Sequence, residues 1–246
     1  ESGMVCYFTP MLSGAYKLYS TPNNSFWCCV GSGFENHARY GECIYAYDAQ
    51  GVFVNLFISS SLNLKEKEIV LQQVTDFPQT GKTNFVITQT PKNRWTLFLR
   101  CPEWAKSARV SINGKPYSAK RTKNNYLILD RNWKSGDKIS MTFSLQLQQS
   151  VVPGNMDLLA LKYGPIVLAG EMMKVDNPFS NPQKNNDYYT FDFQVPSVLD
   201  NTLTSSEIQA LKKIPNKLEF ITPTGKLLKP LYDIHHARYV VYWGKK

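Results

Sequence analysis

The stretches Trp95-Thr96-Leu97-Phe98-Leu99 and Ile139-Ser140-Met141-Thr142-Phe143-Ser144-Leu145 decide the fold class, because apolar side chains recur along them with a period of two. That period is typical of a half-buried β-strand. Short apolar stretches of this kind follow one another through residues 51–150. We expect strands at Val52–Ile58, Ile69–Val74, Phe85–Thr90, Trp95–Leu99, Ala108–Ile112, Tyr126–Leu129 and Lys138–Leu147. Short strands at near-regular spacing predict a mainly β chain built on an antiparallel β-sandwich.

Turn residues separate these strands. Asn113-Gly114 follows Val110-Ser111-Ile112 and precedes Pro116-Tyr117. Both turn residues tolerate a positive φ, so this pair predicts a two-residue β-hairpin. Ser135-Gly136-Asp137 indicates a second turn, just before the strand that starts at Lys138.

The pattern changes after Val152-Pro153-Gly154-Asn155. Leu158–Tyr163 and Ile166–Gly170 are apolar runs separated by Gly164-Pro165, and proline would break a helix, so we interpret them as buried strands. Further on we expect a polar loop over 174–195, a short helix over Ser205–Lys213 and a final aromatic strand over Ile234–Trp243. The predicted domains are residues 1–50, a β-sandwich over 51–150, and a second β-rich domain over 151–246.

Two adjacent cysteines interrupt the run Phe26-Trp27-Cys28-Cys29-Val30-Gly31-Ser32-Gly33-Phe34-Glu35-Asn36. Ser32 and Glu35 have the spacing of a capping box, and small or apolar residues then recur at helical intervals, which predicts a helix over roughly residues 33–47. Cys28 and Cys29 would stand one turn ahead of its N-terminus, where the helix dipole favours an anion such as a thiolate.

Several interpretations of this cysteine pair are open at the level of residues. Both could be small buried hydrophobes beside Trp27, or they could serve as a nucleophile, as metal ligands, or as one of each. Zinc requires three or four ligands, and the pair supplies at most two. Other donors are close in sequence: Glu35, His37, Glu42 and Cys43. The chain has 5 cysteines, an odd number that excludes a complete set of intrachain disulfides.

Composition excludes some classes of protein. The 246 residues are 43% hydrophobic and 13% aromatic, as in globular proteins, and no apolar run reaches the ~20 residues of a membrane span. The net charge of +9 comes from scattered lysines, as in Lys65-Glu66-Lys67-Glu68, which favours a solvated basic surface over a nucleic-acid partner. The chain opens with Glu1 rather than Met, so we expect an upstream region outside it.

Other candidates for chemistry are weaker. His235 and His236 are neighbours on the expected final strand, so they would point to opposite faces and would not share one metal. Four acids near strand ends are expected to be mostly surface residues: Glu103, Asp130, Asp137 and Glu171. Three aromatic residues of the polar loop could stack on sugar rings or anchor the loop: Tyr188, Tyr189 and Phe191.

The run from Phe26 to Glu42 resembles the cysteine motif of the β-L-arabinofuranosidase glycoside hydrolases, families 127 and 146. Several later segments look like the β-rich C-terminal half of that family: Val52 with Asn55-Leu56-Phe57, Trp104-Ala105, Val110-Ser111-Ile112-Asn113-Gly114 and Tyr163-Gly164-Pro165-Ile166-Val167-Leu168-Ala169. The end, Tyr232-Asp233-Ile234-His235-His236-Ala237-Arg238-Tyr239, is similar to the close of Bacteroidetes-type members. The resemblance covers essentially the whole chain.

This resemblance implies an α/α-helical toroid followed by β-sandwich domains, in a retaining exo-glycosidase that acts on L-arabinofuranosides of glycans. Cys28 would be the nucleophile that attacks the anomeric carbon, and Cys29 a zinc ligand beside it, with Zn²⁺ holding both thiols. Zinc would keep the first thiol as a thiolate and orient it. The family also suggests a periplasmic or secreted protein.

The chain departs from the family pattern at its start. In the family a glutamate acid/base and the remaining zinc ligands, a glutamate and a cysteine, lie well upstream, whereas only 27 residues precede Cys28 here. Cys6 lacks the glutamate two residues before it that the upstream motif has. We therefore expect a C-terminal fragment, in which residues 1–50 are the last, helical piece of the catalytic toroid and carry the Cys28-Cys29 motif. We expect it to be inactive alone, because it lacks the acid whose protonation of the leaving group is worth about 10²–10⁴-fold. The alternative is a non-catalytic β-sandwich module that binds carbohydrate or supports another domain.

Overall fold

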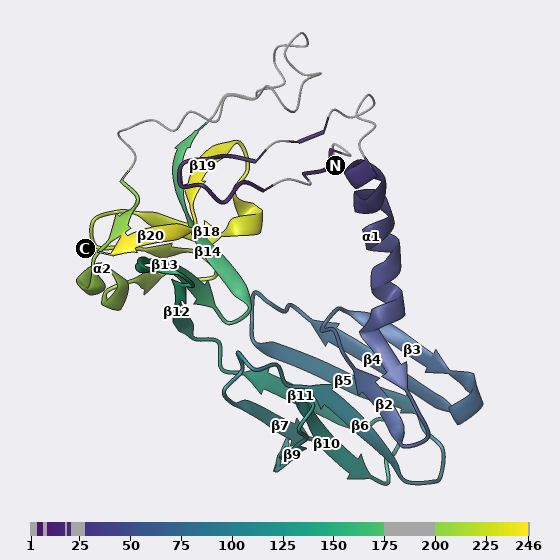
Figure 1. Ribbon diagram of the computed structural model, residues 1–246. Coiled ribbons are helices and arrows are strands. Elements are labelled where there is room, and N and C mark those ends of the chain that lie inside the picture. Colours follow the sequence, from purple (N-terminus) through teal and green to yellow (C-terminus); the bar gives the residue numbers. More distant parts are fainter. Residues whose placement is uncertain (1–3, 7–8, 18, 21–27, 175–199, 246) are drawn as a thin grey trace. The chain divides into compact units, whose positions relative to one another are not determined.

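The computed structural model describes residues 4–6, 9–17, 19–20, 28–174 and 200–245 (Figure 1). Tyr188, Tyr189 and Phe191 lie outside the described residues, as does nearly all of the loop expected over 174–195. The chain divides into two compact units. One unit comprises residues 38–145, and the other comprises residues 1–37 together with 146–246.

Residues 38–145 form a two-sheet β-sandwich (Figure 1). In the five-stranded sheet the order is β1 (Tyr45–Tyr47), β2 (Gly51–Val54), β6 (Trp95–Arg100), β10 (Tyr126–Arg131) and β9 (Lys120–Arg121). In the six-stranded sheet it is β3 (Ser60–Leu64), β4 (Ile69–Thr75), β5 (Lys82–Gln89), β11 (Lys138–Phe143), β7 (Ala108–Ile112) and β8 (Lys115–Tyr117). The predicted sandwich is confirmed.

The core of the sandwich is made by the alternating residues that predicted it. Ile139, Met141 and Phe143 of β11 are at most 3% exposed, and they share one hydrophobic cluster with Leu97 and Leu99 of β6. Ser140 and Thr142 of β11 are only half-buried. A period of two therefore assigns one face of each strand to the interior, as the sequence indicated.

The strands differ from the predicted ones in several places. Strand β1 lies where the helix was expected to continue to residue 47, β2 ends at Val54 rather than Ile58, and β9 was not predicted. The strand β3 was not predicted, because Ser60-Ser61-Leu62-Asn63-Leu64 is more polar than its neighbours. The long strand expected over Lys138–Leu147 ends at Phe143, and a separate strand β12 (Leu147–Val152) follows. Within the sandwich, β2 pairs with β6 in parallel, because the chain passes through the other sheet between these two strands.

Both predicted turns are present, and a hydrogen bond between their side chains connects them. Asn113 and Gly114 have φ values of 51° and 78°, which completes the hairpin between β7 and β8. Gly136 has a φ of 89° in the second turn. Asp137 is buried and its carboxylate accepts hydrogen bonds from Asn113 Nδ2 at 2.8 Å and from the backbone of Lys134 at 2.9 Å. Asp137 is therefore a structural residue of these turns and not the surface acid that was expected.

The other unit is built on a nine-stranded sheet. Its main path is β15 (Thr202–Leu203), β20 (Tyr242–Lys245), β13 (Asn155–Tyr163), β14 (Ile166–Lys174), β18 (Leu227–Pro230), β17 (Phe220–Ile221) and β16 (Lys212–Lys213). Strand β12 pairs with β13, and β19 (Ala237–Val240) pairs with β14. The helix expected over Ser205–Lys213 is shorter, because α2 (Ser205–Gln209) ends before β16.

The predicted final strand is interrupted. A 3₁₀ turn (Leu231–Asp233) precedes β19, and β20 begins only at Tyr242. His235 and His236 lie between the 3₁₀ turn and β19, and His236 has a φ of 50°. The prediction that both histidines lie on a strand with opposite faces is therefore wrong.

Strands β14 and β20 contribute to the interior of this unit through a close contact. Trp243 is fully buried, and a methyl group at Gly170 would lie 2.4 Å from its ring. Only glycine leaves room for the indole at that position. Among the described residues, none of the helices has the length and apolar character needed to cross a membrane.

Candidate functional site

The helix α1 (Cys28–Ile44) starts five residues before the predicted start at residue 33 and carries the cysteine pair itself. Ser32 does not cap it, since its hydroxyl donates to the Cys28 carbonyl one turn earlier, at 3.4 Å. Gly31 and Gly33 did not prevent the helix from extending back to Cys28. Cys28 therefore lies in the first turn, where backbone N–H groups lack helical acceptors and the dipole favours negative charge.

The thiol of Cys28 is exposed, so the interpretation of a buried hydrophobe is wrong for this residue. The side chain of Cys29 lies outside the described residues. Cys43 is exposed near the other end of α1, whereas Cys101 is buried in the core of the sandwich. Cys101 is thus the cysteine that behaves as a small hydrophobe.

The structure tests whether this region can hold zinc by itself. Glu35, His37, Glu42 and Cys43 are all exposed on α1, and Glu42 accepts from Arg39 at 3.1 Å. Across residues 4–6, 9–17, 19–20, 28–174 and 200–245, no three His, Cys, Asp or Glu side chains come together in a way that could hold a metal. The described residues alone therefore do not fit a zinc site, which needs three or four protein ligands.

The other predicted acids lie apart from each other and have their own partners. Asp130 accepts from Arg94 at 2.8 Å, and this contact lowers the pKa of Asp130. Glu171 pairs with Lys229 at 2.6 Å, while Glu103 is exposed. These residues do not form a pair of carboxylates for acid/base chemistry.

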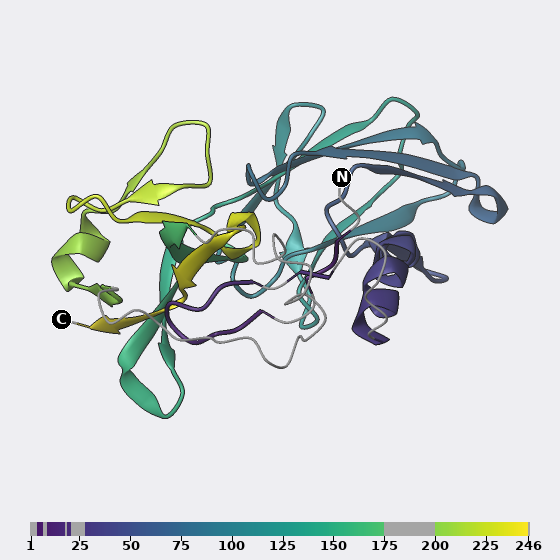
Figure 2. The same cartoon turned by 90° about the horizontal axis from the view of Figure 1, so that it is seen from above.

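An N-terminal strap, which we define as the described residues between 4 and 20, packs on β19 in the unit that includes Cys28. The backbone of Gly14 donates to the Tyr239 carbonyl at 2.8 Å, and Tyr239 donates back to Ala15 at 3.0 Å. The Tyr239 hydroxyl also donates to the carbonyl of Pro10 at 2.5 Å. Figure 2 shows this dark purple segment beside the yellow C-terminal strands.

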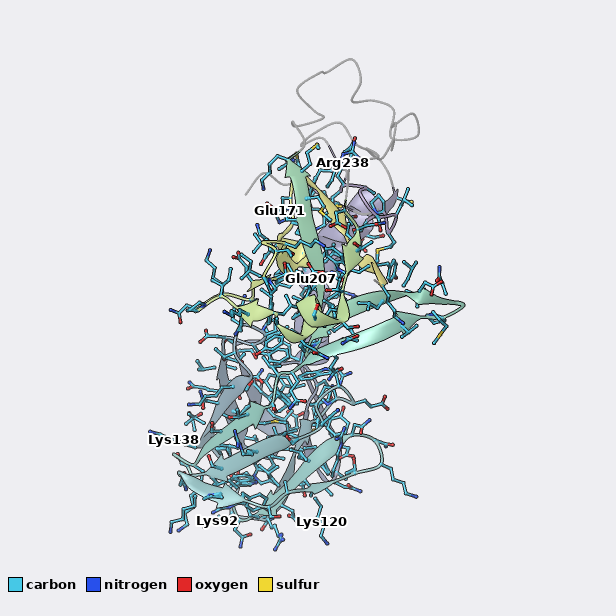
Figure 3. All side chains as sticks on the ribbon, turned by 90° about the vertical axis from the view of Figure 1, so that its left-hand side faces the viewer. Lys92, Lys120, Lys138, Glu171, Glu207 and Arg238 are labelled. Carbon is cyan, nitrogen blue, oxygen red and sulfur yellow. The ribbon has the colours of Figure 1, made fainter. Side chains whose placement is uncertain are left out.

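Two basic side chains fasten the strap. Lys17 is only 7% exposed, and its Nζ donates to the carbonyls of Leu231 at 2.5 Å and Tyr232 at 3.3 Å. Burial lowers the pKa of Lys17, an effect that nearby Cys6 and Asp233 oppose. Arg238, labelled in Figure 3, donates to the carbonyl of Gly14 at 2.7 Å.

Tyr19 and His235 form a hydrogen-bonded pair between the strap and the C-terminal region. Burial raises the pKa of Tyr19 to about 12 and, as the largest effect, lowers that of His235. The ring of His236 lies 5.5 Å from that of Tyr19, between centroids. The sequence did not single out Lys17 or Tyr19, because neither lies in a motif and their partners, Tyr232 and His235, are more than 200 residues away.

A pocket of about 760 Å³ opens between the strap and α1 within this unit. Helix α1 contributes Gly33, Asn36 and His37, which share one helical face, and the strap contributes residues that include Lys17. A methyl group at Gly33 would lie 2.7 Å from Val5, so the helix and the strap are in close contact.

Two family models match the sequence. The model of the β-L-arabinofuranosidase GH127 catalytic domain matches residues 1–42, which include Cys28 and Cys29. The model of the GH127 middle domain matches residues 51–145, the β-sandwich. A search of curated proteins found no match.

Solved structures share the fold. A GH127 β-L-arabinofuranosidase from Geobacillus stearothermophilus T6, Ara127N-Se, matches with a TM-score of 0.68 and 20% identity over 94% of this chain and 39% of its own. The GH127 β-arabinofuranosidase BT3674 matches with a TM-score of 0.70 and 19% identity, over 99% of this chain and 42% of its own. The chain thus spans about two fifths of these proteins. With both family models matching in chain order, this chain belongs to the GH127 β-L-arabinofuranosidase family.

Proposed function

We propose that the chain is the C-terminal part of a retaining exo-glycoside hydrolase that releases L-arabinofuranosyl residues from glycans, with Cys28 as its nucleophile. The observation that carries the proposal is the exposed thiol of Cys28 in the first turn of α1, within the residues that match the catalytic-domain model. We place the whole protein in the periplasm or outside the cell, where such glycans occur.

The chemistry assigned to Cys28 needs an ionised thiol and a free approach to the sugar. Its thiolate attacks the anomeric carbon, the glycosidic C–O bond breaks, and the departing oxygen takes up a proton from an acid. Water then displaces the cysteine sulfur as a thiolate and gives a proton to the conjugate base of that acid. This second inversion means that the configuration is retained overall. The first turn of a helix favours the thiolate because it presents free N–H groups and the positive end of the dipole.

The rest of the proposed site comes from outside the chain. We assign Cys29 as a ligand of Zn²⁺ beside Cys28, and the remaining ligands and the acid/base glutamate to the upstream part of the catalytic domain. The described residues hold no set of three donors, so the isolated chain is expected to bind zinc weakly. It is also expected to be inactive, since the first step lacks its proton donor.

The test compares the 246-residue chain with a longer protein that includes the complete catalytic domain. Both are assayed on 4-nitrophenyl β-L-arabinofuranoside, and their zinc content is measured after dialysis. We expect turnover and about one zinc per molecule in the longer protein, and neither in the chain. Appreciable turnover by the chain alone would contradict the assignment of the acid/base, and equimolar zinc in the chain would show that its own residues complete the metal site.

A second role concerns residues 51–145 alone. They match the middle domain rather than the catalytic domain, and their sandwich has its own closed hydrophobic core. This favours a non-catalytic supporting module. Expressed alone, residues 38–145 should fold cooperatively and show no glycosidase activity; failure to fold would contradict an independent module.

A further inference from the structure

The pocket between the strap and α1 has the composition of a site for a small polar molecule. Its volume of about 760 Å³ lies within the usual range of ligand sites. Ile166, Val167 and Leu231 line it with apolar surface, while Thr9 and Asn36 add a hydroxyl and an amide. A sugar ring combines apolar C–H faces with a rim of hydroxyl groups, so such a lining suits it.

The charge of the lining favours an anion. Lys17 contributes an ammonium group, and no carboxylate is among the described residues that line the pocket. Asp233, which acts on Lys17 electrostatically, does not line it. Lys17 is only 7% exposed, so its ammonium lies where water screens charge less than at the surface. A cationic ligand would be repelled here, and a neutral one would not use the buried charge.

The geometry of Lys17 leaves it able to bind such a ligand. An ammonium group has three N–H donors. Two are directed to the carbonyls of Leu231 and Tyr232, and no third acceptor occurs in the described part of the chain. These two bonds fix the ammonium at the pocket wall, and a carboxylate could accept the remaining donor in a charge-assisted hydrogen bond.

We propose that this pocket binds an acidic sugar, a hexuronate ring whose carboxylate is held by Lys17 and whose hydroxyl groups meet Thr9 and Asn36. A simple carboxylate such as acetate would fill only a small part of the volume of about 760 Å³. The proposal needs neither Cys28 nor zinc, so it is independent of the proposed glycosidase activity.

Calorimetric titration of the 246-residue chain tests this directly. The ligands are sodium glucuronate and galacturonate, with glucose, galactose and sodium acetate as matched probes at constant ionic strength. We expect saturable binding of at least one hexuronate, and roughly tenfold or more weaker binding of its neutral sugar and of acetate, because a charged hydrogen bond is lost in one case and the ring contacts in the other.

Three variants locate the site. Lys17→Met removes the ammonium, and Asn36→Asp keeps the size of an exposed helix residue while placing a like charge in the pocket. Each should weaken hexuronate binding roughly tenfold or more. Lys212→Met, which removes an exposed lysine of β16 outside the pocket, should not change it. Circular dichroism confirms that each variant is folded, and Asn36→Asp decides the test if Lys17→Met does not fold.

Four results would overturn the proposal. They are an absence of saturable hexuronate binding, equal affinity for the neutral sugar, equal affinity for acetate, and unchanged affinity in folded Lys17→Met and Asn36→Asp. The second would leave a site for neutral sugars, the third a general anion site, and the fourth a site elsewhere on the chain.

Discussion

The Nζ of Lys229 lies 2.6 Å from Oε2 of Glu171, and the two side chains are only 18% and 13% exposed. This ion pair links β18 to β14, where Glu171 is labelled in Figure 3. Lys174 approaches the other oxygen of the same carboxylate at 2.7 Å, but its side chain is 71% exposed. Burial alone would raise the pKa of Glu171, and the bonds from both lysines bring it below its usual value.

The two lysines should therefore contribute unequally to stability. Lys229→Met leaves the largely buried carboxylate of Glu171 without its largely buried partner. This substitution should lower the free energy of unfolding by about 1–3 kcal/mol. Lys174→Met is the matched control and should cost less than about 1 kcal/mol, because exposed ion pairs contribute little. Urea denaturation followed by tryptophan fluorescence measures both. An equal loss of unfolding free energy in the two variants would show that burial does not decide how much each ion pair contributes.

Glu207 makes the stability of the same unit depend on pH. The backbone N–H of Thr204 is the largest of the influences that lower the pKa of Glu207 to about 2, followed by the Thr224 hydroxyl. Since the unfolded pKa is about 4.3, the stabilisation is complete above that value and is lost as pH falls toward about 2. Melting temperatures of the wild type should exceed those of Glu207→Gln near pH 7, and the gap should shrink below about pH 4. A gap that stays constant with pH would mean that the ionised carboxylate is not the stabilising form.

Two glycines of α1 should respond oppositely to the same substitution. Nothing lies within 4 Å of a methyl group built at Gly41, so Gly41→Ala should add about 0.5–1 kcal/mol of stability through helix propensity. At Gly33 that methyl group would lie 2.7 Å from Val5, whose branched side chain has little freedom to move. Gly33→Ala should therefore show no gain or a loss in thermal unfolding. A similar gain at both positions would mean that the strap does not pack closely on the helix.

Much of the fold could be predicted because it rests on local patterns. The alternation in β6 and β11 gave the sandwich, and Asn113-Gly114 gave its hairpin, since these signals lie within a few residues of each other. The start of α1 was misplaced because the glycines and Ser32 suggested a cap at a point where the helix already runs. The predicted domain boundaries at residues 50 and 150 remain predictions.

The candidate site could be predicted only in part. The adjacent cysteines stand out in the sequence, and the roles of Cys28 and Cys29 remain predictions. Lys17 and Tyr19 gave no signal, because what makes them unusual is their contact with Leu231 and His235, more than 200 residues later in the chain. Such long-range contacts are invisible to periodicity and spacing.

The role of Cys28 can be separated from that of an ordinary exposed thiol, because α1 carries a second one. Cys28 and Cys43 are both exposed on this helix, at opposite ends. In a longer protein with the complete catalytic domain, Cys28→Ser should lower kcat by at least roughly a thousandfold, as expected when a nucleophile is lost. Cys43→Ser should keep kcat within about twofold. Mass spectrometry after incubation with substrate should find a glycosyl adduct on the peptide with Cys28. Full activity of Cys28→Ser, or an adduct at another residue, would remove Cys28 from the reaction.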